Sequence, residues 1–342
     1  MAGSERDRVV GRAYELLARG DEAGAEAALR QIIAAGDPSD APDAAVSLGA
    51  LLIDRGDVAG ASEAFGYAAE SAHPNFAPRA MFALGLVSHE HGDLDEAASA
   101  YKSAIACGHD GVTPTALFYL GAVMEELAEP AAAIDAYRTA ARSDDTEFAP
   151  LAAYRLATLL ADAGDNEQAA DAYDLAAHGP DQEIATLARL GRGEALAAIG
   201  ELDEAAESFR AVAESGHPEL SSEGACGLGE VLASMGDNSG ARAALSAVSD
   251  TADPLIRGRA ALALGQSLAN DGDLEGAAAA LESAAGSDVP EVAQAAAHRL
   301  ETIKSAMRTG RVPLPAEAAA YLTEFTRASP AADSERPNLQ DI

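Results

Sequence analysis

Residues 78–113 read PRAMFALGLVSHEHGDLDEAASAYKSAIACGHDGVT, and this 36-residue pattern recurs along the chain. A glycine followed by an acidic residue marks each recurrence: Gly20-Asp21, Gly56-Asp57, Gly92-Asp93, Gly164-Asp165, Gly200-Glu201, Gly236-Asp237 and Gly272-Asp273. Ala128-Glu129 fills the one gap in the series, so the register holds across eight units. Self-similarity at a fixed period of this length is typical of stacked-repeat proteins.

The apolar spacing inside the quoted stretch predicts a pair of helices. Apolar residues at helical spacing begin at Ala80 and stop before Gly92, where glycine can adopt the left-handed conformation that ends a helix. A second helix begins at Asp93. One of its faces carries the small residues Ala97 and Ala104 and the large residue Tyr101, and we expect this face to point inward. The sequence therefore predicts one helical hairpin per unit.

The acidic residue of each unit is placed to cap the second helix. A capping box needs an acceptor at the first position and Glu or Gln three residues later. Three units fit this pattern: Asp93 with Glu96, Asp165 with Gln168, and Glu201 with Glu204.

The order Leu84-Gly85, Ala97, Tyr101 and Ala104 resembles that of tetratricopeptide (TPR) repeats. The period exceeds the usual TPR length by two residues, and the loop between hairpins also resembles that of the related Sel1-like repeats. The resemblance covers about residues 6–290, as a bacterial-type array of eight units. It implies an all-α fold, a right-handed superhelical α-solenoid, in which the first helix of each hairpin lines a concave surface.

Composition limits the classes of ligand. With 23 Lys and Arg against 56 Asp and Glu, the net charge is −33, which disfavours nucleic acid and anionic membranes. A partner with a basic segment fits this charge. Solubility and helix capping explain it equally, because acidic residues stabilise helix N-termini.

The sequence predicts a cytoplasmic protein. Residues 1–10 contain no apolar core of a signal peptide, and no stretch approaches the length of a membrane span. The cysteines, Cys107 and Cys226, lie several repeats apart, so we expect no disulfide between them.

The pattern divides the chain into three parts. Residues 1–290 form the eight-unit solenoid, and residues 291–309 continue as a polar helix that caps its last apolar face. Residues 310–342 contain prolines and a short amphipathic helix with Tyr321, Leu322 and Phe325, and are otherwise expected to be disordered.

No pattern of residues indicates catalysis. The chain has no phosphate-binding glycine loop, no HExxH and no CxxC pair, so we predict no enzyme activity, no cofactor and no metal site. His89 and His91 lie two residues apart and point to different faces of a helix, which makes them poor joint metal ligands.

One position of the first helix stays apolar in every unit and is aromatic only in the central ones. Its residues are Val10, Val46, Phe82, Phe118, Tyr154, Leu190, Cys226 and Leu262. Two interpretations stay open: packing between repeats, or a ladder of Phe82, Phe118 and Tyr154, with Tyr119 beside it, that contacts a ligand.

Polar residues that differ between units surround this ladder. Arg79 and Arg155 lie near the starts of first helices, and Glu90, Glu125, Glu126 and Asp162 lie toward their ends. We therefore predict a scaffold or adaptor that binds a peptide or partner protein in its concave groove. The alternative is a regulatory protein whose C-terminal segment docks on its own groove or drives oligomerisation.

Overall fold

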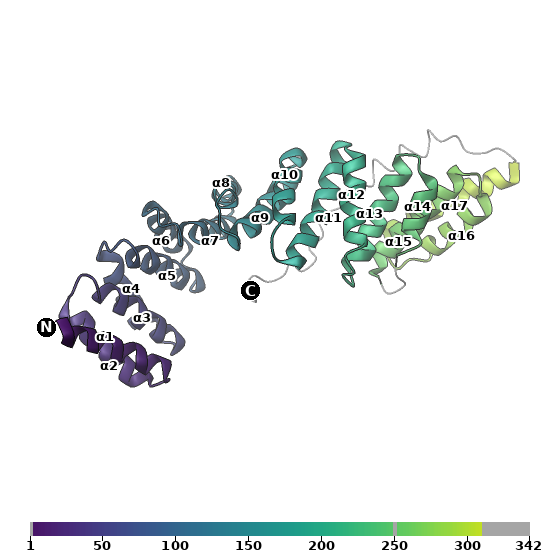
Figure 1. Cartoon of the computed structure of the whole chain (residues 1–342). Coiled ribbons are helices and arrows are strands. Elements are labelled where there is room, and N and C mark those ends of the chain that lie inside the picture. The colour runs from purple at the N-terminus through teal and green to yellow at the C-terminus, as the bar shows by residue number, and fades with distance from the viewer. Residues whose placement is uncertain (1–2, 249–251, 310–342) are drawn as a thin grey trace. The chain divides into compact units, whose positions relative to one another are not determined.

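Seventeen helices make up the described part of the chain, residues 3–248 and 252–309, in the computed structural model (Figure 1). They are α1 Gly3–Ala18, α2 Glu22–Ala35, α3 Ala41–Asp54, α4 Val58–Glu70, α5 Phe76–Glu90, α6 Leu94–Ala106, α7 Thr113–Glu126, α8 Pro130–Ala141, α9 Phe148–Asp162, α10 Asn166–Ala177, α11 Gln182–Ile199, α12 Leu202–Ala213, α13 Leu220–Ser234, α14 Asn238–Leu245, α15 Pro254–Asn270, α16 Leu274–Ala285 and α17 Pro290–Thr309. Helices α1 to α16 pair in chain order as eight hairpins, and α17 follows the last pair. The predicted all-α solenoid is confirmed.

The recurring glycine ends the first helix of a hairpin as predicted. Gly92 has φ +79°, in the left-handed region that favours glycine, and its backbone N–H donates to the carbonyl of His89. Asp93 follows and accepts the first bond of α6 from Ala97 through its carbonyl. Ala128 takes the same turn with φ +57° although it carries a Cβ atom.

The capping prediction is right in one unit and wrong in two. The Asp165 carboxylate accepts from the backbone N–H of Gln168 at 3.3 Å and also from its side-chain amide. Asp93 and Glu201 stand at the N-cap positions of α6 and α12 without a side-chain cap bond. The side chain of Glu201 is one methylene longer than that of Asp, which places its carboxylate farther from the helix start. Nothing in the structure explains why Asp93 makes no cap bond.

Close packing of each hairpin depends on one small and one large residue of its second helix. The alanines are fully buried in all eight: Ala25, Ala61, Ala97, Ala133, Ala169, Ala205, Ala241 and Ala277. Four residues later, Tyr137 packs over Gly121 of the first helix so closely that an added Cβ atom would lie 2.5 Å from its ring. The Leu-Gly pair of the repeat therefore lets a large ring cross the first helix.

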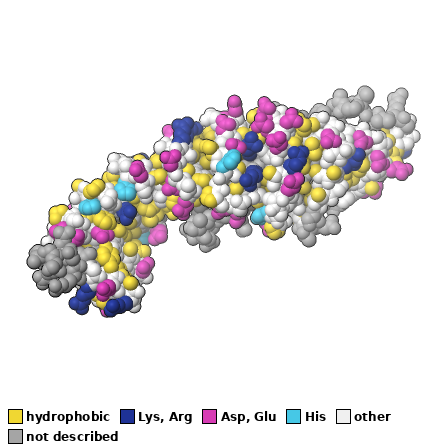
Figure 2. Space-filling model, viewed as in Figure 1, with side chains coloured by type: hydrophobic (Ala, Val, Ile, Leu, Met, Phe, Trp, Pro, Cys, Tyr) yellow, Lys and Arg dark blue, Asp and Glu magenta, His cyan; other side chains and the backbone are white. Residues whose placement is uncertain are grey.

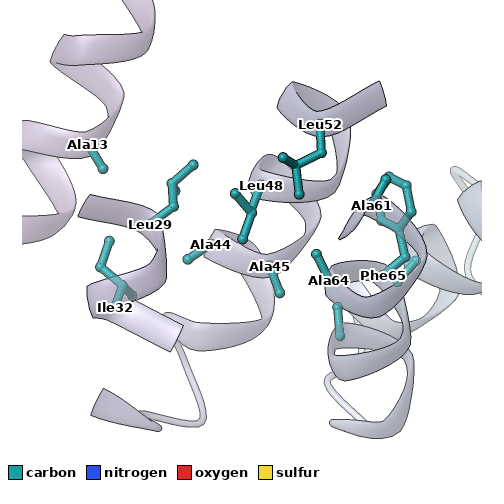
Figure 3. Close-up of a cluster of buried hydrophobic side chains, with 12 residues drawn as sticks. Ala13, Leu29, Ile32, Ala44, Ala45, Leu48, Leu52, Ala61, Ala64 and Phe65 are labelled. Atoms are coloured by element: carbon teal, nitrogen blue, oxygen red, sulfur yellow. The ribbon is translucent and has the colours of Figure 1, made fainter. Parts of the chain in front are cut away.

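The first hairpins show how these faces combine into one core. In Figure 3, Leu29 of α2 points toward Leu48 and Ala44 of α3, with Phe65 of α4 beyond them, and Ile32 belongs to the same cluster. These side chains are nearly inaccessible to solvent. Burial of this apolar surface stabilises each hairpin against the next.

Two junctions between neighbouring hairpins, the first and the last, also carry an ion pair at the same repeat positions. Arg55, which follows α3, donates to Glu26 of α2 at 2.5 Å. Six repeats later, Arg242 stands at the position of Glu26 and Asp271 at the position of Arg55, and these two side chains also form an ion pair. Both bridges join the same two repeat positions, but the acidic and the basic residue have exchanged places.

Contacts between residues divide the chain into two units, Met1–Leu156 and Ala157–Ile342, with the division inside α9. In the second unit, α17 packs on α15 and α16 and buries Val292, Ala296 and Leu300. The predicted boundary at residue 290 stays a prediction, and the predicted tail, residues 310–342, lies outside the described residues.

Acidic side chains outnumber basic ones on the visible surface (Figure 2). Many of the basic ones are held by carboxylates: Arg55 by Glu22 and Glu26, and Lys304 by Glu282. Among the described helices, none is long and apolar enough to cross a membrane.

Candidate functional site

The nine residues predicted for partner binding all lie on first helices of the first unit. Arg79, Phe82 and Glu90 belong to α5. Helix α7 carries Phe118, Tyr119, Glu125 and Glu126, and α9 carries Tyr154 and Arg155. First helices of consecutive hairpins pack on one another, as α3 does on α5. That these helices line a concave surface, as the resemblance implies, stays a prediction.

The predicted ladder is not a simple row of rings. Phe118 is 4% exposed and packs on Tyr137 and Phe148, with ring centroids 5.8 Å and 5.6 Å away. Phe82 instead meets Tyr119 edge to face at 5.5 Å. Phe118 therefore serves packing between repeats, whereas Phe82 and Tyr119 are only half-buried and keep part of their rings accessible. Tyr154 is also half-buried.

Glu125 and Arg155 bind each other rather than standing apart as independent polar groups. The Arg155 guanidinium donates to Glu125 Oε1 from Nε at 3.1 Å and from Nη2 at 2.7 Å. The Tyr137 hydroxyl donates to the same oxygen at 2.6 Å. Burial opposes the charge on Arg155, yet Tyr137 and Glu125 together raise its pKa. This network joins α7, α8 and α9 and is internally satisfied.

One repeat earlier, the same tyrosine has no partner. Tyr101 is fully buried, and its hydroxyl is one of the few buried polar atoms of the described residues without a hydrogen bond. The positions of Glu125 and Arg155 are taken there by His89 and Tyr119. His89 turns instead to Glu126, with 2.7 Å between Nε2 and Oε1.

Burial raises the pKa of Tyr101, and the nearby Tyr119, Glu90 and Glu126 add to the rise. Of these, Tyr119 packs against Tyr101, with 6.0 Å between the ring centroids. Glu90 is exposed, and the Glu126 side chain is 52% exposed. Arg79 is exposed too and lies 6.0 Å from the ring of Phe76. The face thus combines accessible aromatic edges, a buried hydroxyl and carboxylates.

Sequence reasoning placed Tyr101 on the inward face of its helix but did not connect it or Tyr137 with the candidate site, and it missed Phe148 and the contact of His89. The sequence separation between residues on consecutive first helices could have indicated such contacts. Some residues that meet across consecutive first helices lie one repeat minus about two helical turns apart, as Glu125 and Arg155 do at 30 residues, whereas His89 and Glu126 lie one residue more than a repeat apart. Within the described residues, no three His, Cys, Asp or Glu side chains are placed to hold a metal ion.

Comparison with known proteins places this arrangement in a family. The tetratricopeptide repeat model matches residues 10–75, 51–111, 125–184, 181–218 and 226–296. No curated protein is similar enough to match the chain.

Similar solved structures are TPR proteins. One from Parabacteroides merdae shares 20% identity over 77% of this chain and 98% of its own, with a TM-score of 0.42. The C-terminal part of a TPR protein from Cytophaga hutchinsonii shares 15% over 84% and 98%, with a TM-score of 0.48. YrrB, described as a TPR protein with an unusual peptide-binding site, shares 23% over 55% and 91%, with a TM-score of 0.44.

The family model covers well over half of the chain, in step with the hairpins that the structure shows. The chain therefore belongs to the tetratricopeptide repeat family, whose members are generally protein-interaction scaffolds built on a typically non-enzymatic fold.

Proposed function

We propose that this protein is a non-enzymatic scaffold or adaptor that binds a peptide or protein segment on the inner face of α5 and α7. The observation that carries the proposal is the pair of half-buried rings, Phe82 and Tyr119, beside the unpartnered hydroxyl of Tyr101. Aromatic side chains that keep an accessible edge in a preformed cluster are typical anchors of protein interfaces.

The buried hydroxyl favours a ligand with a polar group. A buried polar atom without a partner costs about 1–3 kcal/mol, and the neighbouring repeat avoids this cost through Glu125 and Arg155. Because this hydroxyl is closed to solvent, a ligand reaches it only by displacing the rings of Phe82 and Tyr119 that pack on Tyr101, and a hydrogen bond to it then removes the cost. Carboxylates of Glu90 and Glu126 beside it favour a basic segment, whose approach the net charge also accelerates.

The test is a comparison of two variants of the full chain. Phe82→Ala with Tyr119→Ala removes both accessible rings, and Tyr67→Ala removes a more exposed ring from α4, which carries none of the predicted binding residues. Partners recovered by affinity purification from the native host are compared by quantitative mass spectrometry. We expect the double variant to lose a set of partners that the Tyr67 variant retains. Equal recovery by two folded variants would overturn the proposal.

Tyr101→Phe sharpens the same test. It removes only the unpartnered hydroxyl, so the stability of the free protein should stay the same or rise, while affinity for the recovered partner should fall. A merely structural tyrosine would give the opposite, a loss of stability with unchanged affinity.

The alternative function, docking by the C-terminal segment, concerns Tyr321, Leu322 and Phe325, which lie outside the described residues. It stays a prediction, as does the cytoplasmic location.

A further inference from the structure

The last described helix carries an arginine without an acceptor. Arg299 of α17 stands at the same position of the 36-residue pattern as Arg155 of α9, four repeats earlier. The Arg155 guanidinium donates to Glu125 from Nε and Nη2. Nη1 of Arg299, in contrast, is closed to solvent and, among the described residues, has no hydrogen-bond partner. The two arginines share a repeat position and differ in what surrounds them.

The repeat explains why the acceptor is missing. Ala269 of α15 stands at the position of Glu125, and Leu281 of α16 stands at the position of Tyr137. The packing is otherwise the same, because Leu281 crosses closely over Gly265 of its own hairpin and α17 packs on both α15 and α16. Two apolar side chains thus stand where the earlier arginine has a carboxylate and a hydroxyl.

The charge of Arg299 is uncompensated within the described part of the chain. Burial lowers its pKa, and no carboxylate there raises it again. The pKa of Arg155 is raised despite burial, because an acidic partner and a tyrosine surround it. Glu282 of α16 is bound by Lys304 at 3.0 Å. An enclosed charge without a partner is unfavourable, so a carboxylate that binds Arg299 stabilises the folded chain.

The position is open to an incoming carboxylate from one side. Arg299 and Ala269 are both half-buried, so each keeps part of its surface accessible although Nη1 is enclosed. At the equivalent contact, the side chains of Glu125 and Arg155 are 17% and 20% exposed. The short side chain of Ala269 leaves the place that the longer glutamate takes in the other repeat.

Residues 310–342 supply carboxylates near this position. Arg299 lies ten residues before Thr309, the end of α17, or about 15 Å along the helix. The first acidic residue beyond it, Glu317, is eight residues further on, which spans about 26 Å at full extension. A tethered group reaches an effective concentration on the order of millimolar, which favours it over a carboxylate of another molecule. The acidic residues of this segment are Glu317, Glu324, Asp333, Glu335 and Asp341.

We propose that Arg299 binds a side-chain carboxylate from residues 310–342, which takes the place that Glu125 has beside Arg155. Paired N–H donors of a guanidinium match the two oxygens of a carboxylate, as the earlier repeat shows. The contact ties the chain that follows α17 to the last hairpin. It lies in the second unit and is separate from the aromatic residues of α5 and α7.

Zero-length cross-linking of the full chain identifies the carboxylate. Arg299→Lys places an amine at this position, and a carbodiimide forms an amide bond between an amine and a carboxylate in direct contact. The ion pair of Lys304 and Glu282, at 3.0 Å, is an internal reference for the yield. Peptide mass spectrometry should find the new amine joined to an acidic residue of 310–342, with a yield similar to that of the reference.

The matched control is Gln294→Lys, which places an amine at an exposed position of the same helix, five residues earlier and on a different face. It should give severalfold less product with residues 310–342. Equal yields from the two variants would overturn the proposal, since tethering alone would then explain the product. A product of Arg299→Lys that joins two molecules, or that involves only acidic residues before residue 310, would overturn it as well.

Thermal unfolding examines the same pair from the stability side. Arg299→Met removes the charge and suits the apolar surroundings. It is made in the unmodified full chain and in a full-length chain whose five acidic residues after residue 309 are replaced by Gln or Asn. We expect the melting temperature to rise in the neutralised chain, where an unpaired charge is removed, and to fall or stay unchanged in the unmodified chain, where a pair is removed.

Arg308→Met is the control for this comparison. Arg308 is an exposed residue of the same helix and lies closer to residue 310, so its substitution should give the same small change in both chains. Equal effects of Arg299→Met in the two chains would contradict the proposal. A dependence on the neutralised residues that is as large at Arg308 would contradict it too, because general attraction would then suffice.

Discussion

Ala128 occupies a backbone conformation that glycine holds at the same place in the other hairpins. Its φ is +57°, against +72° to +88° for the seven glycines from Gly20 to Gly272. In this region the Cβ atom of an L-residue approaches the following carbonyl and costs about 1–2 kcal/mol. The strain belongs to this one residue, because the turn around it is otherwise the same.

Ala128→Gly should therefore raise the free energy of unfolding by about 1 kcal/mol. The substitution relieves the backbone strain, and the larger entropy of glycine in the unfolded chain offsets part of that gain. Urea unfolding followed by circular dichroism measures it. Ala297→Gly is the control, since an exposed alanine inside α17 should lose about 1 kcal/mol on the same change. A loss of stability in both variants would show that the turn is not strained.

Pairs of helices from adjacent hairpins are joined by polar networks that differ from one repeat to the next. Tyr137 of α8, Glu125 of α7 and Arg155 of α9 form the most completely bonded of those on the inner face of the first unit. The side chains of Glu125 and Arg155 are only 17% and 20% exposed. Removing one partner therefore leaves a poorly solvated charge.

Glu125→Leu should destabilise the protein by about 2 kcal/mol, because it leaves the Arg155 guanidinium and the Tyr137 hydroxyl without their acceptor. Arg155→Met added to it should recover part of the loss, since no unpaired charge then remains. A double-mutant cycle in thermal or urea unfolding measures the coupling. Strictly additive losses would contradict a shared network.

The sequence predicts the helical hairpins well because the same residue types recur at the positions that start, end and pack each helix. A glycine ends the helix, an acidic residue begins the next, and the small and large residues of the second helix are the same in kind in every unit. Contacts between hairpins depend instead on which turn of one helix faces which turn of the next. The packing of Phe118 on Phe148 and the ion pair between Glu125 and Arg155 follow from that registry, so residue type alone did not reveal them.

Over the whole molecule, the net charge is −33, so the excess carboxylates repel one another. Part of this charge has a structural use, since Asp57, Asp237 and Asp273 accept hydrogen bonds from the backbone at helix starts. The remainder is spread over a surface with few basic residues (Figure 2). The folded chain therefore holds many like charges at closer range than the unfolded chain does.

Raising NaCl from about 10 mM to 300 mM should increase the melting temperature, because the screening length falls from about 30 Å to below 10 Å. KCl should give the same increase at equal ionic strength, since screening does not depend on which monovalent cation is present. A fall in melting temperature with salt would mean that the ion pairs between hairpins contribute more than the repulsion.

The two bridges of opposite polarity have a consequence for how the hairpins are ordered along the chain. Glu26 binds Arg55, whereas Arg242 binds Asp271 at the equivalent positions. If the first hairpin docked on the last one, Glu26 would meet Asp271, and two carboxylates would repel at the junction. The exchanged charges of these two junctions thus disfavour docking of the first hairpin on the last one, and with it this swapped arrangement, during folding.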